Sequence, residues 1–428
     1  MGSLDERPPD HVAIIGAGLG GSALALALNR NSIPCRIYET RMPDAPEIAS
    51  GVVLTPNGLH ILNELGVFDR IKSICWQSEF RTTKNDRDET TRKTLIANEQ
   101  LYGYKNHRLY RRVLLQEMRA MLDERNISVQ YNARFGGVVS EDLESGVTFT
   151  INGKHENASL LVGADGIHST IRQYLQPGAL PDYTGVVGVL AHIQWSAVDW
   201  PYPDYERACT IQGQPGALFW IPEVADGSEI MVGLQTKRPL QTRTEWEAES
   251  ADKDKLCEFY RKGYDEWTAT GKKVIDAVCA NKQSLFMWPF MRVPALERWS
   301  SRTGRIVIVG DAAHALPPSS AQGVNQALED VYSLSLLLKL HPFSTSTPEG
   351  IAKRLVALGS WQKMRQERID RIFDWATNVA NVNRLPQDER DRLVREGKIA
   401  DDDKGNDMSW LYKPVQDQDI IDQLEATA

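Results

Sequence analysis

A short stretch near the start of the chain, residues 11–39, constrains the fold more than any other part of the sequence. It has the sequence HVAIIGAGLGGSALALALNRNSIPCRIYE. Residues 11–15 form an apolar run that predicts a buried strand, and Gly16, Gly18 and Gly21 follow at once. Residues 22–31 are rich in alanine and leucine and predict a helix.

The three glycines have separate physical roles in such a turn. Gly16 permits the tight turn, Gly18 lets the backbone approach a pyrophosphate closely, and Gly21 lets the helix pack against the strand. The first-turn amides and the positive end of the helix dipole would then face a diphosphate.

A second strand is predicted over residues 34–39, and it ends in an acidic residue, Glu39. That carboxylate follows the glycines at the spacing from which an acid accepts hydrogen bonds from ribose hydroxyls. Strand, helix, strand and terminal acid together predict a unit that binds an adenine dinucleotide.

Length and charge narrow the class of protein. The 428 residues suggest two or three domains, and the net charge of −8 does not favour nucleic acid as a partner. No apolar run approaches the roughly 20 residues that span a bilayer, and the polar start MGSLDERPPD has no signal-peptide core. We expect no transmembrane segment and a cytoplasmic enzyme. The 5 scattered cysteines indicate neither a disulfide framework nor a zinc site.

A second turn between a strand and a helix lies near the middle of the chain. Residues 160–163 predict a buried strand, and Asp165 stands in a tight Ala-Asp-Gly turn before a helix that begins near residue 169. Upstream, a predicted helix over residues 110–125 carries Arg111 and Arg112 in its first turn, which the helix dipole disfavours. Either an anionic partner lies near that end, or the arginines are solvated or paired with acidic side chains.

A third such turn follows residue 300. A buried strand over residues 305–310 leads to Asp311, and a helix begins near Gly323 and runs through residue 340. Asp311 is placed to accept a hydrogen bond from a ribityl hydroxyl. Amides at 323–325 could stabilise negative charge on a ligand.

Residues 181–282 have a different pattern. Strand-like runs at 186–195, 208–212, 217–222 and 229–235 precede a charged helical segment at 244–280. The period near two predicts a mostly antiparallel sheet with one apolar face, which would suit an apolar ligand. The aromatic residues within it are individually expected to be core or edge packing.

These motifs together resemble the FAD-dependent single-component aromatic monooxygenases, typified by salicylate and 4-hydroxybenzoate hydroxylases and including fungal biosynthetic relatives. The matching segments are G-A-G-x-G-G at 16–21 with Glu39, G-A-D-G-x-x-S-x-x-R at 163–172, and G-D-A-A-H at 310–314 continuing to 322–323 and 329–330. Their order and spacing cover most of residues 10–345, which makes the combination far more specific than any one motif.

The resemblance implies an α/β fold, with a Rossmann-like FAD-binding domain, a mostly antiparallel β substrate domain and C-terminal helices. We expect the FAD-binding domain to comprise residues 1–75, 101–180 and 283–345. The substrate domain would comprise 76–100 and 181–282, and a C-terminal helical region and tail 346–428.

The resemblance also implies roles for individual residues. The expected FAD-binding residues are Gly16, Gly18, Gly21, Glu39, Gly51, Val52, Arg111, Asp165, Asp311, Pro317, Gly323, Val324 and Asn325. Glu39 would hold the adenosine ribose, Gly51 and Val52 would line the flavin by their main chain, and Pro317 would lie near its reactive face. Asp165 belongs to the motif credited with supporting both FAD and NADPH binding.

The implied reaction uses NADPH or NADH as a transient co-substrate, because no second G-x-G-x-x-G follows a strand. The flavin would be reduced, react with molecular oxygen to form a flavin hydroperoxide, and deliver oxygen to an electron-rich carbon. The activity implied is hydroxylation or epoxidation of a small aromatic or heteroaromatic molecule, expected to be a secondary metabolite. The chain would act as a monomer or homodimer.

The substrate end of the sequence is less informative. An arginine and a tyrosine that some fungal relatives place in the substrate domain have no clear counterpart in Val189-Leu190-Ala191-His192 and Phe219-Trp220-Ile221-Pro222. This favours a larger, apolar substrate over a small phenolate bound by charges. His192 could act on a substrate proton, or it could be structural. A flavin-dependent oxidase or halogenase on the same scaffold, and a non-catalytic flavin-binding module, remain the alternatives.

Overall fold

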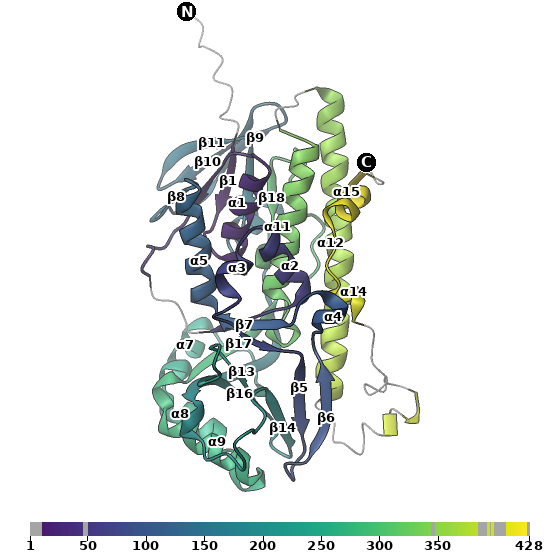
Figure 1. Cartoon of the computed structure of the whole chain (residues 1–428). Helices are drawn as coiled ribbons and strands as arrows, with labels where there is room; N and C mark the ends of the chain where they lie inside the picture. Colours follow the sequence, from purple (N-terminus) through teal and green to yellow (C-terminus); the bar gives the residue numbers. More distant parts are fainter. Residues whose placement is uncertain are drawn as a thin grey trace, which may run out of the picture.

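A parallel sheet of five strands lies at the centre of the α/β part of the molecule (Figure 1). The computed structural model describes residues 11–45, 50–343, 347–383, 392–393, 395–397 and 408–425. The strand order is β18 (Ile306–Ile308), β12 (Leu160–Gly163), β1 (Val12–Ile15), β2 (Cys35–Tyr38) and β8 (Ser128–Gln130). Every residue of the first three is buried, as expected for strands covered on both faces.

Three helices pack around this sheet: α1 (Leu19–Arg30), α5 (Arg111–Glu124) and α11 (Gly323–Leu340). Helix α1 contacts both of the others. Its alanines and leucines are buried all along its length, which explains why its sequence lacks a polar face. A three-stranded antiparallel sheet of β9 (Phe135–Asp142), β10 (Gly146–Ile151) and β11 (Lys154–Ala158) extends this part, with α6 (Thr170–Leu175) against β9.

A second small sheet has the order β3 (Gly51–Leu54), β7 (Asn106–Tyr110) and β4 (Trp76–Ser78). Its strands pair antiparallel, with Gly51 opposite Tyr110. Three short helices, α2 (Pro56–Glu64), α3 (Phe68–Ile71) and α4 (Glu99–Tyr102), lie between β3 and β7 in the chain.

A seven-stranded sheet forms the other large part of the molecule. Its order is β17 (Phe286–Arg292), β13 (Asp182–Gln194), β16 (Glu229–Lys237), β15 (Gly216–Pro222), β14 (Cys209–Gly213), β5 (Phe80–Lys84) and β6 (Thr90–Leu95). All neighbours pair antiparallel except β14 and β5, which are parallel. The predicted antiparallel sheet is therefore present, with one parallel junction.

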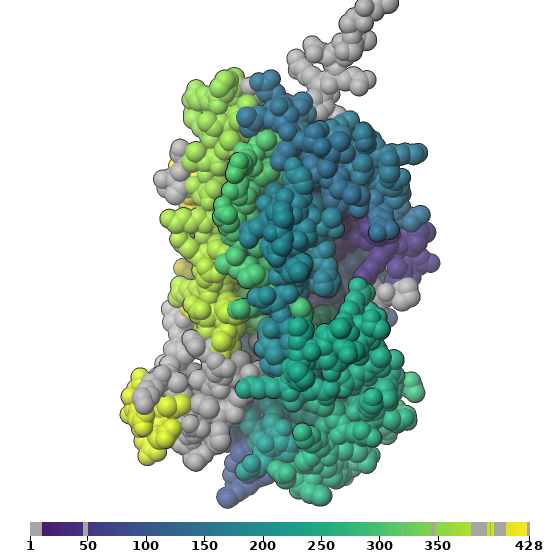
Figure 2. All heavy atoms as spheres, turned by 180° about the vertical axis from the view of Figure 1, so that it is seen from behind, coloured from purple at the N-terminus to yellow at the C-terminus, as the bar shows by residue number. Residues whose placement is uncertain are grey.

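One face of this sheet packs on three helices, α7 (Arg243–Ala251), α8 (Lys253–Arg261) and α9 (Ala269–Ala280). Side chains alternate along each strand, so Val187, Val189 and Ala191 of β13 point into this core. Figure 2 shows the arrangement from behind, with the blue atoms of β9 to β11 at the top and the teal and green atoms of α7 to α9 at the bottom.

Two strands pair with strands that were predicted to belong to the other domain. Strand β17 pairs with β13, although residues 283–345 were expected in the FAD-binding domain, and β4 pairs with β7 rather than with β5. Pro289 is tolerated in β17 because the strand lies at the sheet edge. The division of the chain into domains stays a prediction.

A long helix, α12 (Pro348–Asn383), runs along one side of the molecule and packs on α11 (Figure 1). Helices α14 (Ser409–Tyr412) and α15 (Asp417–Glu425) lie further along the chain. Among the helices of the described residues, none combines the length and the hydropathy needed to cross a bilayer.

Candidate active site

The first glycine turn follows β1 and is built so that side chains are excluded. Gly16 has φ of +106°, and a Cβ on it would lie 2.5 Å from the Ala164 carbonyl oxygen. A Cβ on Gly21 would lie 1.9 Å from the carbonyl oxygen of Gly16. Gly18 precedes α1, and no side chain in the described part of the chain caps the N-terminus of this helix by a hydrogen bond. The turn therefore requires glycine and leaves amide donors for a ligand.

Glu39 stands beside this turn, directly after β2. One carboxylate oxygen accepts from the Ala17 amide at 2.7 Å and the other from the Arg41 amide at 2.8 Å. These bonds fix the orientation of the carboxylate next to the N-terminus of α1.

The second turn, after β12, places Asp165 against the first. Its Oδ2 accepts from the amides of Thr170 and Ile171 at 2.8 and 3.3 Å, while its buried Oδ1 has no partner among the described residues. Burial raises the pKa of Asp165. An acceptor oxygen held at the sheet edge without a donor is an observation that a bound polar group would explain.

Arg172 joins the second turn to the third. This buried guanidinium donates to the carbonyls of Ala179, Ala312 and Ile167 at 2.9, 3.0 and 2.6 Å. Ala312 belongs to α10 (Asp311–His314), the short helix of the third turn. Arg172 therefore links the second turn to the third by hydrogen bonds within the protein.

In the third turn Asp311 is exposed, whereas the nearby side chains of His314 and Asp330 are buried. Asp330 accepts from the Gly310 amide at 2.8 Å, and its carboxylate lies 2.5 Å from His314 Nε2. A Cβ on Gly323 would lie 3.9 Å from Asp311 Oδ1, so the start of α11 lies next to this carboxylate.

The first turn of α11 is tied to β3 through Asn325. Its fully buried amide donates to the Val53 carbonyl at 3.0 Å and accepts from the Thr55 amide at 3.1 Å. Val52 is buried and Val324 is half-buried against the same core. Among the described residues, no side chain caps this helix start either, so its amides are available to a ligand.

Two further predicted FAD-binding residues are Arg111 and Pro317. Arg111 begins α5, and its guanidinium lies 3.9 Å from where a Cβ on Gly18 would be, while its amide donates to the Ser50 carbonyl at 2.8 Å. Pro317 is half-buried in the loop after α10, and its carbonyl accepts from the Ser320 hydroxyl at 2.9 Å.

The three turns converge at one edge of the parallel sheet. They follow β1, β12 and β18, which are adjacent and parallel, so their carboxyl ends share one edge of the sheet. Two uncapped helix starts, the glycine contacts and the unpartnered oxygen of Asp165 fit a dinucleotide cofactor with an extended diphosphate.

The half-buried face of the seven-stranded sheet lies on the side of β3 and β7. It carries mainly apolar and aromatic side chains: Leu190, Phe219, Ile221, Met231, Phe286 and Trp288. Arg108 Nη2 lies 3.5 Å from Met231 Sδ, which places β7 against this face. The apolar wall expected from the sequence is thus present next to the segment predicted to line the flavin.

His192 lies on this face within a polar cluster that the sequence did not reveal. Its Nε2 lies 3.3 Å from Glu223 Oε1, and that oxygen also accepts from Arg108 Nη2 at 2.7 Å. Tyr110 of β7 is adjacent, with its ring centroid 5.5 Å from that of His192. Its hydroxyl donates to Glu229 at 2.6 Å, and burial together with this bond raises the pKa of Tyr110.

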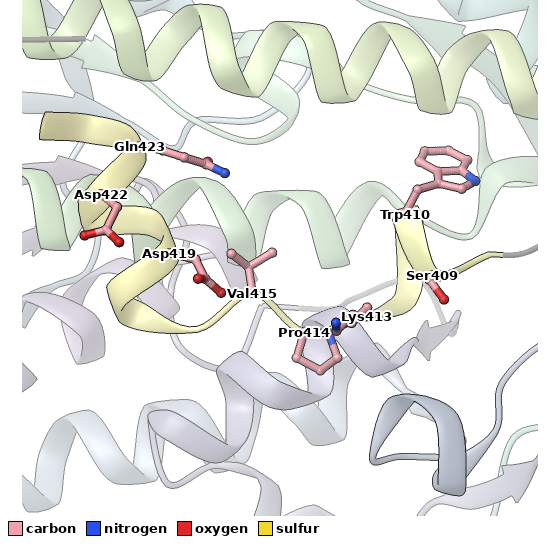
Figure 3. Close-up of a pocket in the computed structure, with 8 residues that line it drawn as sticks. All are labelled: Ser409, Trp410, Lys413, Pro414, Val415, Asp419, Asp422 and Gln423. Carbon is pink, nitrogen blue, oxygen red and sulfur yellow. The ribbon is translucent and has the colours of Figure 1, made fainter. Parts of the chain in front are cut away.

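A shallow groove lies elsewhere, on the C-terminal helices (Figure 3). It runs between α14, which contributes Trp410, and α15, which contributes Asp419, Asp422 and Gln423. None of the predicted site residues lines it.

A parallel sheet with these three turns at one edge is typical of a dinucleotide-binding α/β fold. Residues 10–347 match the FAD binding domain family, and the chain belongs to that family. The chain is 27% identical over 414 residues to a 3-amino-4-hydroxybenzoate 2-monooxygenase of Streptomyces platensis, covering 95% of this chain and 96% of that protein. It is 28% identical over 389 residues to a hispidin-3-hydroxylase of Neonothopanus nambi, covering 84% and 86%.

Among solved structures, the substrate complex of a salicylate hydroxylase superposes with a TM-score of 0.74, covering 99% of each chain at 19% identity. This likeness confirms the fold. The predicted family is confirmed, and the chain is an FAD-dependent monooxygenase.

Proposed function

We propose that the protein uses NADH or NADPH and molecular oxygen to hydroxylate or epoxidise an aromatic or heteroaromatic secondary metabolite. The observation that carries this proposal is the position of the apolar sheet face, which lies against β3 and β7 beside the three convergent turns. The two relatives are named for the hydroxylation of a substituted benzoate and of hispidin, and these names support an aromatic substrate.

In this proposal the three turns hold FAD along its length. The amides after Gly18 bind the diphosphate with Arg111 beside them, and Glu39 accepts from the adenosine ribose. Asp311 accepts from the ribityl chain, and the amides from Gly323 to Asn325 support negative charge on the flavin ring.

FAD, when bound, would supply the redox chemistry, by accepting electrons from NAD(P)H and activating molecular oxygen. The chain's own residues bind, orient and exclude water. Phe219, Met231 and Phe286 shield the reacting face from solvent, which matters because activated oxygen in contact with water is lost as hydrogen peroxide. His192 takes a proton from the substrate, which makes the attacked carbon more electron-rich.

The proposal is tested with the FAD-loaded enzyme and a panel of hydroxylated aromatic compounds that includes 3-amino-4-hydroxybenzoate. We expect NAD(P)H oxidation to rise with a matching compound, and one oxygen atom from ¹⁸O₂ to appear in the product. Dehydrogenated product without ¹⁸O would instead show an oxidase, and halide incorporation would show a halogenase. Absence of any stimulated NAD(P)H oxidation across a broad panel would favour a non-catalytic flavin-binding module.

A further inference from the structure

A buried ion pair connects the small sheet of β3 and β7 with the seven-stranded sheet, beside His192. Arg108 lies on β7 and Glu223 directly follows β15, and their side chains are only 7% and 0% exposed. A Cβ on Gly51 would lie 1.9 Å from Glu223 Oε2, so the carboxylate presses against the main chain of β3. The pair therefore lies between the segment predicted to line the flavin and the wall of the substrate site.

The hydrogen bonds of Glu223 are unevenly distributed between its two oxygens. Oε1 accepts from Arg108 and lies within reach of His192, whereas the buried Oε2 has no partner in the described part of the chain. Burying an ion pair offsets much of its attraction, and an unsatisfied buried oxygen adds a further cost. The Arg108–Glu223 pair is therefore poorly explained by a contribution to stability and better explained by orientation of the His192 imidazole.

The imidazole of His192 is fixed on several sides. Its ring is stacked on Phe286 at an interplanar angle of 14° and is tilted against Tyr110. The hydroxyl of Tyr110 is committed to Glu229, and Arg112 lies over the Tyr110 ring, so Glu223 is the acidic group that meets the imidazole directly. The other ring nitrogen, Nδ1, makes no hydrogen bond to any described residue.

We propose that Glu223, held in place by Arg108, is a positioning residue that keeps the proton of His192 on Nε2. A carboxylate at Nε2 requires a donor there, which leaves the lone pair on Nδ1. The substrate O–H or N–H bond then breaks as an Nδ1–H bond forms, leaving a substrate anion and an imidazolium that faces the Glu223 carboxylate. This inference rests on the proposed function for the identity of the group that gives up the proton.

The tautomer can be measured without any substrate. Nitrogen-15 NMR of histidine-labelled, FAD-loaded enzyme reports which ring nitrogen carries the proton, and His192→Asn identifies the signal. We expect Nε2–H in the wild type and a loss of that preference in Glu223→Gln, whose amide can either donate or accept. An unchanged tautomer in Glu223→Gln would overturn the inference and leave the proposed function untouched.

Removing one charge of a buried pair can unfold a protein, so a second variant is needed. Arg108→Met/Glu223→Gln removes both charges and leaves neither unpaired. We expect it to remain folded and to show the same loss of the Nε2–H preference as the single variant. Retention of that preference in the folded double variant would equally overturn the inference. Glu249→Gln is the matched control, because Glu249 pairs with Arg238 at the same 2.7 Å but lies on α7.

Turnover gives a second readout once a substrate is known. For Glu223→Gln we expect kcat per bound FAD to fall about 10-fold, which is part of the roughly 100-fold or more that a positioned general base contributes. Glu249→Gln should leave kcat unchanged. A purely structural role for Glu223 would lower thermal stability or FAD content while kcat per bound FAD stayed at the wild-type value, and that outcome would also reject the inference.

Discussion

Glu329 shows how a single carboxylate can be kept charged inside this protein. Its two oxygens meet Arg368 at 2.5 and 2.7 Å, and one of them also meets Arg365 at 2.6 Å. Burial alone would raise the pKa of Glu329, but the charges of Arg368 and Arg365 outweigh it and lower the pKa to about 2. Glu329 therefore stays ionised at ordinary pH values and helps to hold Arg365, which also donates to Asp330, the acceptor of the Gly310 amide in the third turn.

This lowered pKa predicts a specific loss of stability in acid. A folded-state pKa below the usual 4.5 contributes stability that is present above that value and disappears as the pH falls from about 4.5 to about 2. The contribution is on the order of 3 kcal/mol. Unfolding by denaturant at a series of pH values should show a shallower acid slope for Glu329→Gln than for the wild type. Equal slopes would contradict the prediction.

Some residues of the candidate site could be predicted from the sequence, and others could not. Gly16, Glu39 and Asp165 were predictable because each follows a strand within one short local pattern. Arg108 and Glu223 were not, because they pair across 115 positions and neither belongs to a local motif. A charged residue in a strand usually faces solvent, so the sequence gives no sign that these two are buried against each other.

At the scale of elements, the packing of β16 gives a test of the substrate wall. A Cβ on Gly233 would lie 2.3 Å from Phe219 Cζ and 2.7 Å from Leu190 Cδ2. We expect Gly233→Ala to displace these side chains and to raise KM for the aromatic substrate about 10-fold or more, since reshaping a packed pocket costs at least 1 kcal/mol. Gly359→Ala on α12, where a Cβ meets nothing within 4 Å, is the control and should leave KM unchanged.

The contact between α12 and α11 predicts a large effect of one substitution. Arg365 donates to Asp330 at 2.7 Å and to Glu329 at 2.6 Å, and its side chain is only 3% exposed. Arg365→Met leaves two buried carboxylates short of a partner and should reduce the free energy of unfolding by about 3–5 kcal/mol. Lys353→Met on the same helix breaks an exposed pair with Glu349 and should change it by less than about 1 kcal/mol. Similar losses in the two variants would refute this account of the interface.

Most long elements were predicted from periodicity, including the helices near residues 22–31 and 110–125 and four of the seven strands of the large sheet, β13 to β16. Strands β3, β7 and β17 were not identified. Each is bordered by residues that also suit a loop or a helix start, and β17 contains Pro289. Their pairing depends on partners far along the chain, such as β13 for β17, and local propensity does not contain that information.

At the scale of the whole molecule, FAD should contribute to stability through several distant segments at once. The proposed ligands of the cofactor come from three turns and two helix starts, so removing FAD leaves all of them without a partner. At FAD concentrations 100-fold above Kd, ligand binding should add about 2.7 kcal/mol to the free energy of unfolding. The thermal midpoint of the apoprotein should therefore rise with added FAD. A midpoint that does not respond to FAD would contradict the assignment.

The parallel junction between β14 and β5 has a consequence for engineering. The hairpin of β5 and β6 precedes α5 in the chain, whereas β13 to β16 follow α6. The seven-stranded sheet therefore combines two segments that are separated in sequence by α5 and α6, and these segments meet where β14 pairs with β5. A chimera made by grafting residues 181–282 from a homologue would give β14 a foreign neighbour in β5. Exchange of specificity between such enzymes should therefore succeed only when both pieces of the sheet are transplanted together.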